Sequence, residues 1–304
     1  MPFIGISYQN SQKDEEYRKR FSKISEIEKV IKAAVKLGLR KFAAATPDSS
    51  PLSPIHLQAL QLTISEGHSL EIFPCVGIPL CLGTKKIDPF RRWATYLDIE
   101  SQLYQETKTL IIEDPILNFR EDWKNRLIAS KPYSEEDFRE LVIDWERINK
   151  NLQFFTEFPT SHIEFGSEID FLAMTERFDL IGELVERAKA YGFKKVLLGV
   201  HHAGMTIPLL KDRLQDFEGY VTPLNPLGVM MFPTKQSAEK AVNTVKKSVY
   251  AIKPLAGGRV KPRRAFKYLL KHPIDGCMIG VSSIPELKEN LKAAELTFRK
   301  GTPA

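Results

Sequence analysis

Short apolar runs alternate with amphipathic stretches along most of the chain. In the amphipathic stretches apolar residues recur three or four positions apart, as at Ile24, Ile27, Ile31 and Val35, and Gly38 then follows as a helix C-cap. Strands that alternate with helices are typical of a parallel sheet covered by helices. The apolar runs that we predict as strands are residues 3–8, 41–45, 70–78, 109–112, 162–165, 195–200, 219–224, 249–252 and 276–280.

The number of these runs indicates a barrel. Nine candidates exceed by one the eight strands of a (β/α)8 barrel. The 85–160 segment is longer than one βα unit needs, so we expect an elaboration over the mouth or flank that carries 109–112 as the additional strand. No linker divides the chain, and the sequence therefore predicts an α/β fold with a single TIM-barrel domain over residues 1–304. The predicted helices are 24–37, 93–107, 134–155 (capped by Ser134), 178–191, 237–247, 263–270 and 284–294.

Composition and charge fit an ordinary globular enzyme. The 304 residues are 43% hydrophobic and 27% charged, enough for a large core. The net charge of +6 is spread along the chain, mostly beside acidic residues, without the basic and aromatic clusters of nucleic-acid binders. We therefore expect no nucleic-acid partner and a small-molecule ligand that is anionic or phosphorylated.

Cysteine usage and hydropathy indicate the compartment. Cys75, Cys81 and Cys277 form no CxxC pair, which favours a reducing environment over a disulfide scaffold. No apolar run approaches the roughly 20 residues that a membrane span needs. We expect a cytoplasmic protein without a membrane partner, while its oligomeric state stays open.

Candidate chemistry lies at the carboxyl ends of the predicted strands, where barrel active sites form. Alternate residues of a strand face opposite sides. In residues 162–168, HIEFGSE, Ile163 and Phe165 suit the helix side, so Glu164 and Glu168 point inward or upward.

Two further strand ends supply partners for Glu164. The same alternation leaves His201 inward, with neighbouring His202 on the opposite face. Tyr250 and Ile252 are predicted to face the helices, so Lys253 is predicted to project into the mouth. A carboxylate inside a barrel needs a compensating cation, so we predict that Glu164, His201 and Lys253 converge.

This trio permits several interpretations. It is either a structural ion pair that fills the barrel or a catalytic acid–base group. Glu164 could also join Glu113, Asp114, Glu168 and Asp170 as oxygen ligands of a divalent metal. Their spacing is not diagnostic, so we predict no metal site and treat a metal as the less favoured cofactor.

The last two predicted βα turns favour an anion. Gly257 and Gly258 follow one strand and precede several basic residues. Gly280 ends the next strand, and Ser282 or Ser283 caps the helix behind it, whose free N–H groups attract anions. Barrels often bind phosphate between these two turns.

Four segments give the chain a resemblance to the aldo/keto reductase superfamily. They are residues 198–202 (LGVHH), 223–227 (PLNPL), 252–258 (IKPLAGG) and 279–283 (IGVSS), the last followed by Glu289 and Asn290. The resemblance implies a (β/α)8 barrel whose final turns hold NADP. It adds Asn290 to the cofactor-binding candidates, beside Gly257, Gly258, Gly280, Ser282, Ser283 and Lys288, the last of which could reach a 2′-phosphate.

The catalytic tetrad of that superfamily is missing. Ala43 or Ala44 stands where its Asp belongs, and the stretch from Asp48 to Pro51 stands in place of its Tyr. Residues 77–80 lack its Lys, and 166–168 lack its His. Three hypotheses follow: an NADP-dependent oxidoreductase with a rebuilt active site, a non-redox lyase or isomerase that uses Lys253 or a carboxylate-bound metal, or a non-catalytic barrel that binds a phosphorylated ligand or a partner protein.

Overall fold

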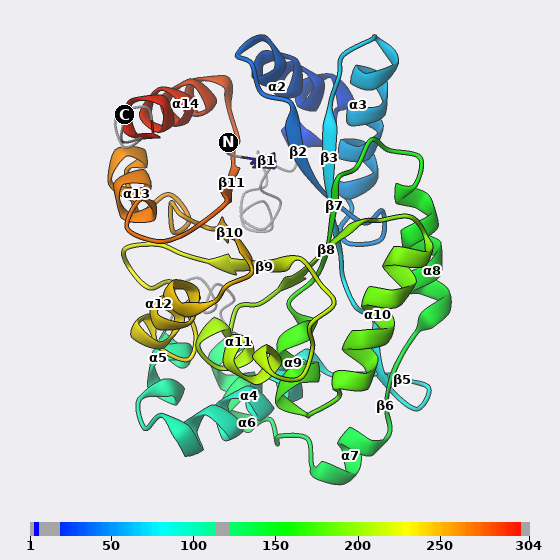
Figure 1. Cartoon of the computed structure of the whole chain (residues 1–304), viewed down its shortest axis with the longest axis vertical. Helices are drawn as coiled ribbons and strands as arrows, with labels where there is room; N and C mark the ends of the chain where they lie inside the picture. The colour runs from blue at the N-terminus through cyan, green and yellow to red at the C-terminus, as the bar shows by residue number, and fades with distance from the viewer. Residues whose placement is uncertain (1–2, 6–18, 114–121, 299–304) are drawn as a thin grey trace.

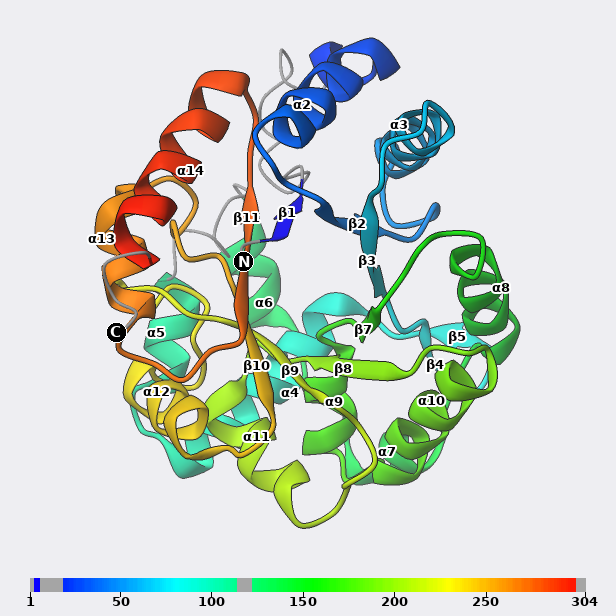
Figure 2. The same cartoon turned by 45° about the horizontal axis from the view of Figure 1, so that its top comes forward.

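The computed structural model, which describes residues 3–5, 19–113 and 122–298, contains a closed barrel. Eight parallel strands follow one another round it in the order β1, β2, β3, β7, β8, β9, β10 and β11, and β11 pairs back onto β1. Figure 2 looks into this ring of strands. The barrel strands are β1 (Phe3–Gly5), β2 (Lys41–Ala45), β3 (Glu71–Val76), β7 (His162–Phe165), β8 (Lys195–Gly199), β9 (Gly219–Pro223), β10 (Ser248–Ile252) and β11 (Gly276–Gly280).

Helices cover the outside of the barrel (Figure 1). Those that follow the barrel strands are α2 (Ile24–Lys36), α3 (Ser53–Ser65), α9 (Glu168–Met174), α10 (Phe178–Ala190), α11 (Ala203–Lys211), α12 (Lys235–Thr244), α13 (Pro262–Leu269) and α14 (Ile284–Phe298). The predicted TIM barrel is confirmed, and eight of the nine predicted strands are its strands, with ends shifted by at most two residues where the structure describes them. Predicted residues 6–8 of the first strand lie outside the described residues.

The ninth predicted strand, 109–112, is wrong because these residues belong to helix α5 (Thr107–Glu113). Its two isoleucines, Ile111 and Ile112, pack in a cluster with Phe90 and Leu97 of α4 (Pro89–Leu103). A short apolar run fits a strand or a buried helix equally well, and here packing against α4 decides for the helix.

The predicted helix 134–155 is two helices and a strand. Ser134 caps α7 (Glu135–Arg139) as predicted, in a reciprocal capping box with Asp137. The chain then forms β6 (Leu141–Ile143), and α8 (Trp145–Phe155) starts behind it. Strand β6 pairs antiparallel with β4 (Leu80–Leu82), which also pairs with β5 (Lys85–Lys86), so edge pairing breaks the helix.

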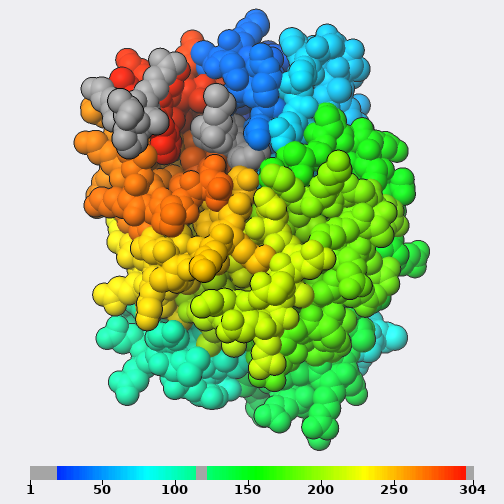
Figure 3. Space-filling view, in the orientation of Figure 1, coloured from blue at the N-terminus to red at the C-terminus, as the bar shows by residue number. Residues whose placement is uncertain are grey.

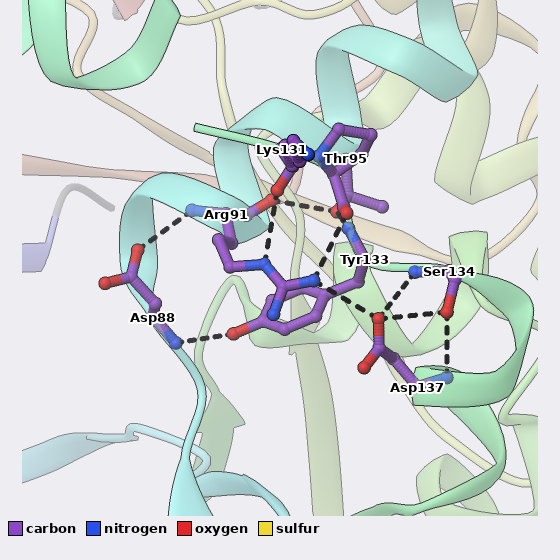
Figure 4. Close-up of polar contacts among 8 residues, drawn as sticks. Asp88, Arg91, Thr95, Lys131, Tyr133, Ser134 and Asp137 are labelled. Atoms are coloured by element: carbon purple, nitrogen blue, oxygen red, sulfur yellow. Dashed lines mark hydrogen bonds and ion pairs between the residues drawn. The ribbon is translucent and has the colours of Figure 1, made fainter. Parts of the chain in front are cut away.

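The elaborated segment between β3 and β7 gathers at one end of the molecule, where Figure 1 shows α4, α7 and α6 (Trp123–Ala129) together. Arg91 of α4 connects its parts (Figure 4). Its guanidinium donates to the carbonyls of Lys131 and Pro132, pairs with Asp137 at 3.2 Å and lies over the Tyr133 ring. These contacts connect α4 to residues 131–137.

The barrel interior is filled by its own side chains. Phe73, Leu197, Val221, Tyr250 and Met278, each from a different strand, form one apolar cluster. A larger cluster lies between the strands and the surrounding helices. These side chains fill the middle of the barrel, so we look for a ligand site at its carboxyl-terminal mouth.

Candidate active site

Glu164 lies inside the barrel near its carboxyl-terminal mouth, with a side chain that is only 7% exposed. It is in register with Cys75 of β3, whose thiol hydrogen-bonds to its carboxyl group. On the other side it lies over Gly199, where an added Cβ would come within 2.6 Å of Oε1. A side chain at position 199 would therefore displace Glu164, which explains the glycine.

Burial raises the pKa of Glu164 to about 7, although the nearby Lys253 charge and the Cys75 hydrogen bond both lower it. The pKa of the Cys75 thiol is raised well above its ordinary value, first by burial and then by Glu164. The thiol therefore stays protonated as a donor. Glu164, in contrast, can take up and release a proton near neutral pH.

Lys253 faces the mouth for a reason other than the predicted one. Tyr250 and Ile252 pack in the barrel interior and not against the helices, so simple alternation would turn Lys253 outward. However, β10 ends at Ile252, and Lys253 adopts a left-handed backbone with φ of 54°. This turn brings its amine close enough to Glu164 for their charges to interact.

Lys253 has no direct ion pair within the described part of the chain, although its side chain is half-buried. Burial lowers the pKa of its amine, and the Glu164 charge only partly opposes this. A desolvated amine without a direct counterion carries a larger neutral fraction than an exposed lysine.

His201 completes the predicted trio. Its backbone N–H donates to the buried Asp170 at 2.7 Å, which fixes the turn after β8. Burial lowers the pKa of the imidazole well below its ordinary value, and the charges of Lys253 and Arg92 lower it further. The structure thus brings Glu164, Lys253 and a neutral His201 together, while their catalytic role stays a prediction.

Arg92 is a mouth residue that the sequence analysis missed. It belongs to α4, in the segment without any family resemblance, and no local motif marks it. Its guanidinium pairs with Glu168 at 3.0 Å, so Glu168 forms part of an ion pair. The Nε atom of Arg92 is buried without a hydrogen-bond partner among the described residues.

A second buried network supports the mouth from behind. His202 turns away from His201, and its Nδ1 hydrogen-bonds to Glu100 of α4. Both side chains are at most 1% exposed. Burial lowers the pKa of His202, but the Glu100 carboxylate outweighs this, so the pKa is raised overall. This pair attaches α4 to the turn after β8 and has a structural role.

The two turns that were predicted to bind an anion are present, but the Ser282 hydrogen-bond donors in the second turn are already bound within the chain. Ser283 caps α14, as its hydroxyl accepts from the Glu286 N–H at 3.3 Å. The Glu286 carboxylate folds back and accepts from the Ser282 N–H at 2.7 Å and from its hydroxyl at 2.8 Å. The predicted phosphate position after Gly280 is therefore occupied by the chain's own carboxylate.

The other cofactor candidates lie around these turns. Gly257 and Gly258 adopt φ of 68° and 84°, so their turn needs glycine. Lys288 is exposed on α14. Asn290 is 1% exposed, and neither atom of its amide has a partner among the described residues.

The oxygen ligands weighed for a metal do not gather. Among the described residues, no group of three or more His, Cys, Asp or Glu side chains could hold a metal ion. Glu113 ends α5, Glu168 pairs with Arg92, and Asp170 caps the turn after β8. Asp114 lies outside the described residues.

Comparison with known proteins shows the fold. No family model and no curated protein matches the chain. A solved Pseudomonas aeruginosa protein, provisionally named an aldo-keto reductase, is 12% identical with a TM-score of 0.53 over 97% of this chain and 90% of its own. Gox0644 in its apo form is 13% identical with a TM-score of 0.49 over 99% and 91%. The Pyrococcus furiosus tryptophan synthase α-subunit is 12% identical with a TM-score of 0.33 over 87% and 96%.

The first of these likenesses supports the barrel fold and leaves the chemistry to the residues at the mouth. Its identity of 12% is too low to carry an activity over to this chain. No helix in the described ranges is long and apolar enough to cross a membrane.

Proposed function

We propose that this chain is an enzyme that catalyses proton transfer on a small anionic carbonyl compound at the barrel mouth, as a non-redox lyase or isomerase. The observation that carries the proposal is the proximity of Glu164, with a pKa of about 7, to Lys253, whose amine pKa is lowered by burial. Perturbed acids and amines that face each other in a mouth are typical of active sites.

The chemistry uses both groups. The neutral Lys253 amine attacks the carbonyl carbon, and one of its protons passes to the carbonyl oxygen to give a carbinolamine. Protonated Glu164 then donates its proton to the new hydroxyl group, which leaves as water. The resulting iminium withdraws electrons from the neighbouring carbon. Glu164, now a carboxylate, then takes a proton from that carbon and yields an enamine, so atoms and charge balance without an oxidant or reductant.

Arg92 supplies the specificity for an anion. Its Nε donor has no partner among the described residues, and its charge reaches His201 at the mouth. A carboxylate or phosphate of the substrate would accept from this donor. Neutral His201 is positioned to donate or accept one hydrogen bond beside it.

Hydrogen–deuterium exchange tests the proposal. Pyruvate, 2-oxobutyrate and dihydroxyacetone phosphate are incubated with the protein in deuterated buffer, and loss of the proton signal next to the carbonyl is followed by NMR. We expect protein-dependent exchange of at least one probe, reduced about 10²-fold or more in Glu164→Gln and in Lys253→Arg. The surface variant Glu289→Gln is the control and keeps the wild-type rate.

Exchange that is absent for every probe, or equal in all variants, contradicts the proposal. Binding of a probe without exchange would favour the non-catalytic barrel instead.

An NADP-dependent oxidoreductase is the second candidate. It is favoured by the reductase-like motifs at residues 252–258 and 279–283 and by the unpartnered amide of Asn290, which a cofactor base could satisfy. The Ser282 donors do not fit a phosphate while Glu286 holds them, so we derive no step through NADP. A thermal-shift titration with NADPH decides: stabilisation that is lost in Ser282→Asp/Ser283→Asp supports this candidate.

A further inference from the structure

A groove on the outer surface of the barrel, between α12 and α13, concentrates positive charge. Figures 1 and 2 show these two helices as neighbours, and in Figure 3 their yellow and orange surfaces adjoin. The groove has a volume of about 980 Å³. Its six cationic lining residues are Lys235, Lys261, Arg263, Arg264, Lys267 and Lys271.

Acidic residues do not balance this charge. Glu239 is the one acidic side chain in the lining. It already accepts a 2.5 Å hydrogen bond from the Tyr268 hydroxyl and lies 3.7 Å from the Lys235 amine. The other five cations form no ion pair with any described residue. The chain as a whole has 44 basic and 38 acidic residues, so this local excess is not a consequence of composition.

Three of these cations lie at the N-terminus of α13, where the helix dipole disfavours positive charge. Lys261 is the N-cap of α13, Arg263 and Arg264 lie in its first turn, and this turn contains no acidic residue. The helix dipole places partial positive charge at the same end, so these cations repel it. A bound anion would remove this repulsion.

We propose that this groove binds a small polyphosphorylated compound. Five unpaired cations exceed what a single phosphate can contact, whereas a chain of phosphates can reach along α13. The volume lies in the range of small-molecule sites. A single-stranded nucleic acid would need exposed aromatic rings for base stacking, but Tyr268 is 9% exposed and its hydroxyl is engaged.

The groove is separate from the proposed active site. None of Glu164, Lys253, His201 or Arg92 lines it. Occupancy of the groove is therefore independent of any reaction at the mouth, and the two proposals can fail separately.

Isothermal titration of the full chain with inorganic triphosphate tests the proposal. We expect saturable binding that weakens with added salt and is much tighter than binding of inorganic phosphate. Arg264→Gln/Lys267→Gln should weaken it at least about tenfold, because two charge-assisted contacts are lost. The matched control Lys36→Gln/Lys194→Gln removes two exposed charges elsewhere and should bind as the wild type does.

Several results would overturn the proposal. The first is no binding of triphosphate, and the second is equal weakening in both double variants. The third is tighter binding of single-stranded RNA than of triphosphate, which would identify a nucleic-acid surface. Glu164→Gln should leave triphosphate binding unchanged; if it abolishes binding, the triphosphate occupies the mouth and not the groove.

Discussion

The substitution Glu164→Gln should change how the stability of the fold depends on pH. Glutamine keeps the shape of a protonated glutamate but cannot ionise. In the folded chain burial raises the pKa of Glu164 from 4.5 to about 7. In the unfolded chain the pKa of this carboxyl group returns to its ordinary value of 4.5. The folded wild type therefore resists losing this proton, and the variant has no proton to lose.

The sign and size of this pH effect on the free energy of unfolding follow from the linkage between proton binding and folding. A carboxyl pKa that is raised on folding contributes stability that is fully present below pH 4.5 and is lost as the pH rises through about 7. Each unit of pKa shift corresponds to 1.36 kcal/mol, so the wild type loses about 3 kcal/mol from this group between pH 4.5 and pH 8. Glu164 is buried, so solvent screening does not reduce this figure greatly.

Urea unfolding at pH 4.5 and pH 8 measures this effect. The difference in unfolding free energy between Glu164→Gln and wild type should shift in favour of the variant by about 3 kcal/mol on going to pH 8. The control Glu289→Gln changes an exposed carboxylate and should follow the wild type at both values. A Glu164→Gln variant with the wild-type pH dependence would refute the raised pKa.

Three other substitutions probe the supports of the site. Gly199→Ala should lower the unfolding free energy by roughly 1–3 kcal/mol in urea unfolding, because its Cβ would meet Glu164 and the Phe165 carbonyl. Gly182→Ala, whose Cβ has ordinary space in α10, is the tolerated control; equal losses would contradict the close fit. Glu100→Gln should cost about 3 kcal/mol by breaking the buried His202 pair, and more at pH 6 than at pH 9, because a raised histidine pKa stabilises the fold below it; a loss independent of pH would refute the pair. Glu286→Gln should destabilise α14 by about 0.5–1 kcal/mol and strengthen sulfate binding, measured by titration; unchanged binding would show that Glu286 does not block Ser282.

The barrel could be predicted from sequence because its strands are short, apolar and regularly spaced. Glu164 could be placed as well, since Ile163 and Phe165 pack toward the helices and leave it inward. Such predictions rest on local alternation within one strand. They hold where the strand is regular up to the residue of interest.

The errors arose where tertiary contacts override local pattern. Tyr250 and Ile252 were predicted to face the helices, but both pack in the barrel interior. Lys253 reaches the mouth because its backbone is left-handed, and a lysine in the sequence does not predict that conformation. Arg92 comes from a helix far along the chain, and only the fold brings it to His201. Five of the six groove cations lie close together in the sequence, within residues 261–271, and only the fold adds Lys235 of α12 to them.

Trapping of an imine on Lys253 tests the central claim most directly. The protein is incubated with pyruvate, 2-oxobutyrate or dihydroxyacetone phosphate, reduced with borohydride, digested and analysed by peptide mass spectrometry. The proposed chemistry predicts a reduced adduct of at least one probe on Lys253, absent from Lys253→Arg and slower to form in Glu164→Gln. An unmodified Lys253 with every probe, or modification spread evenly over surface lysines, would contradict it.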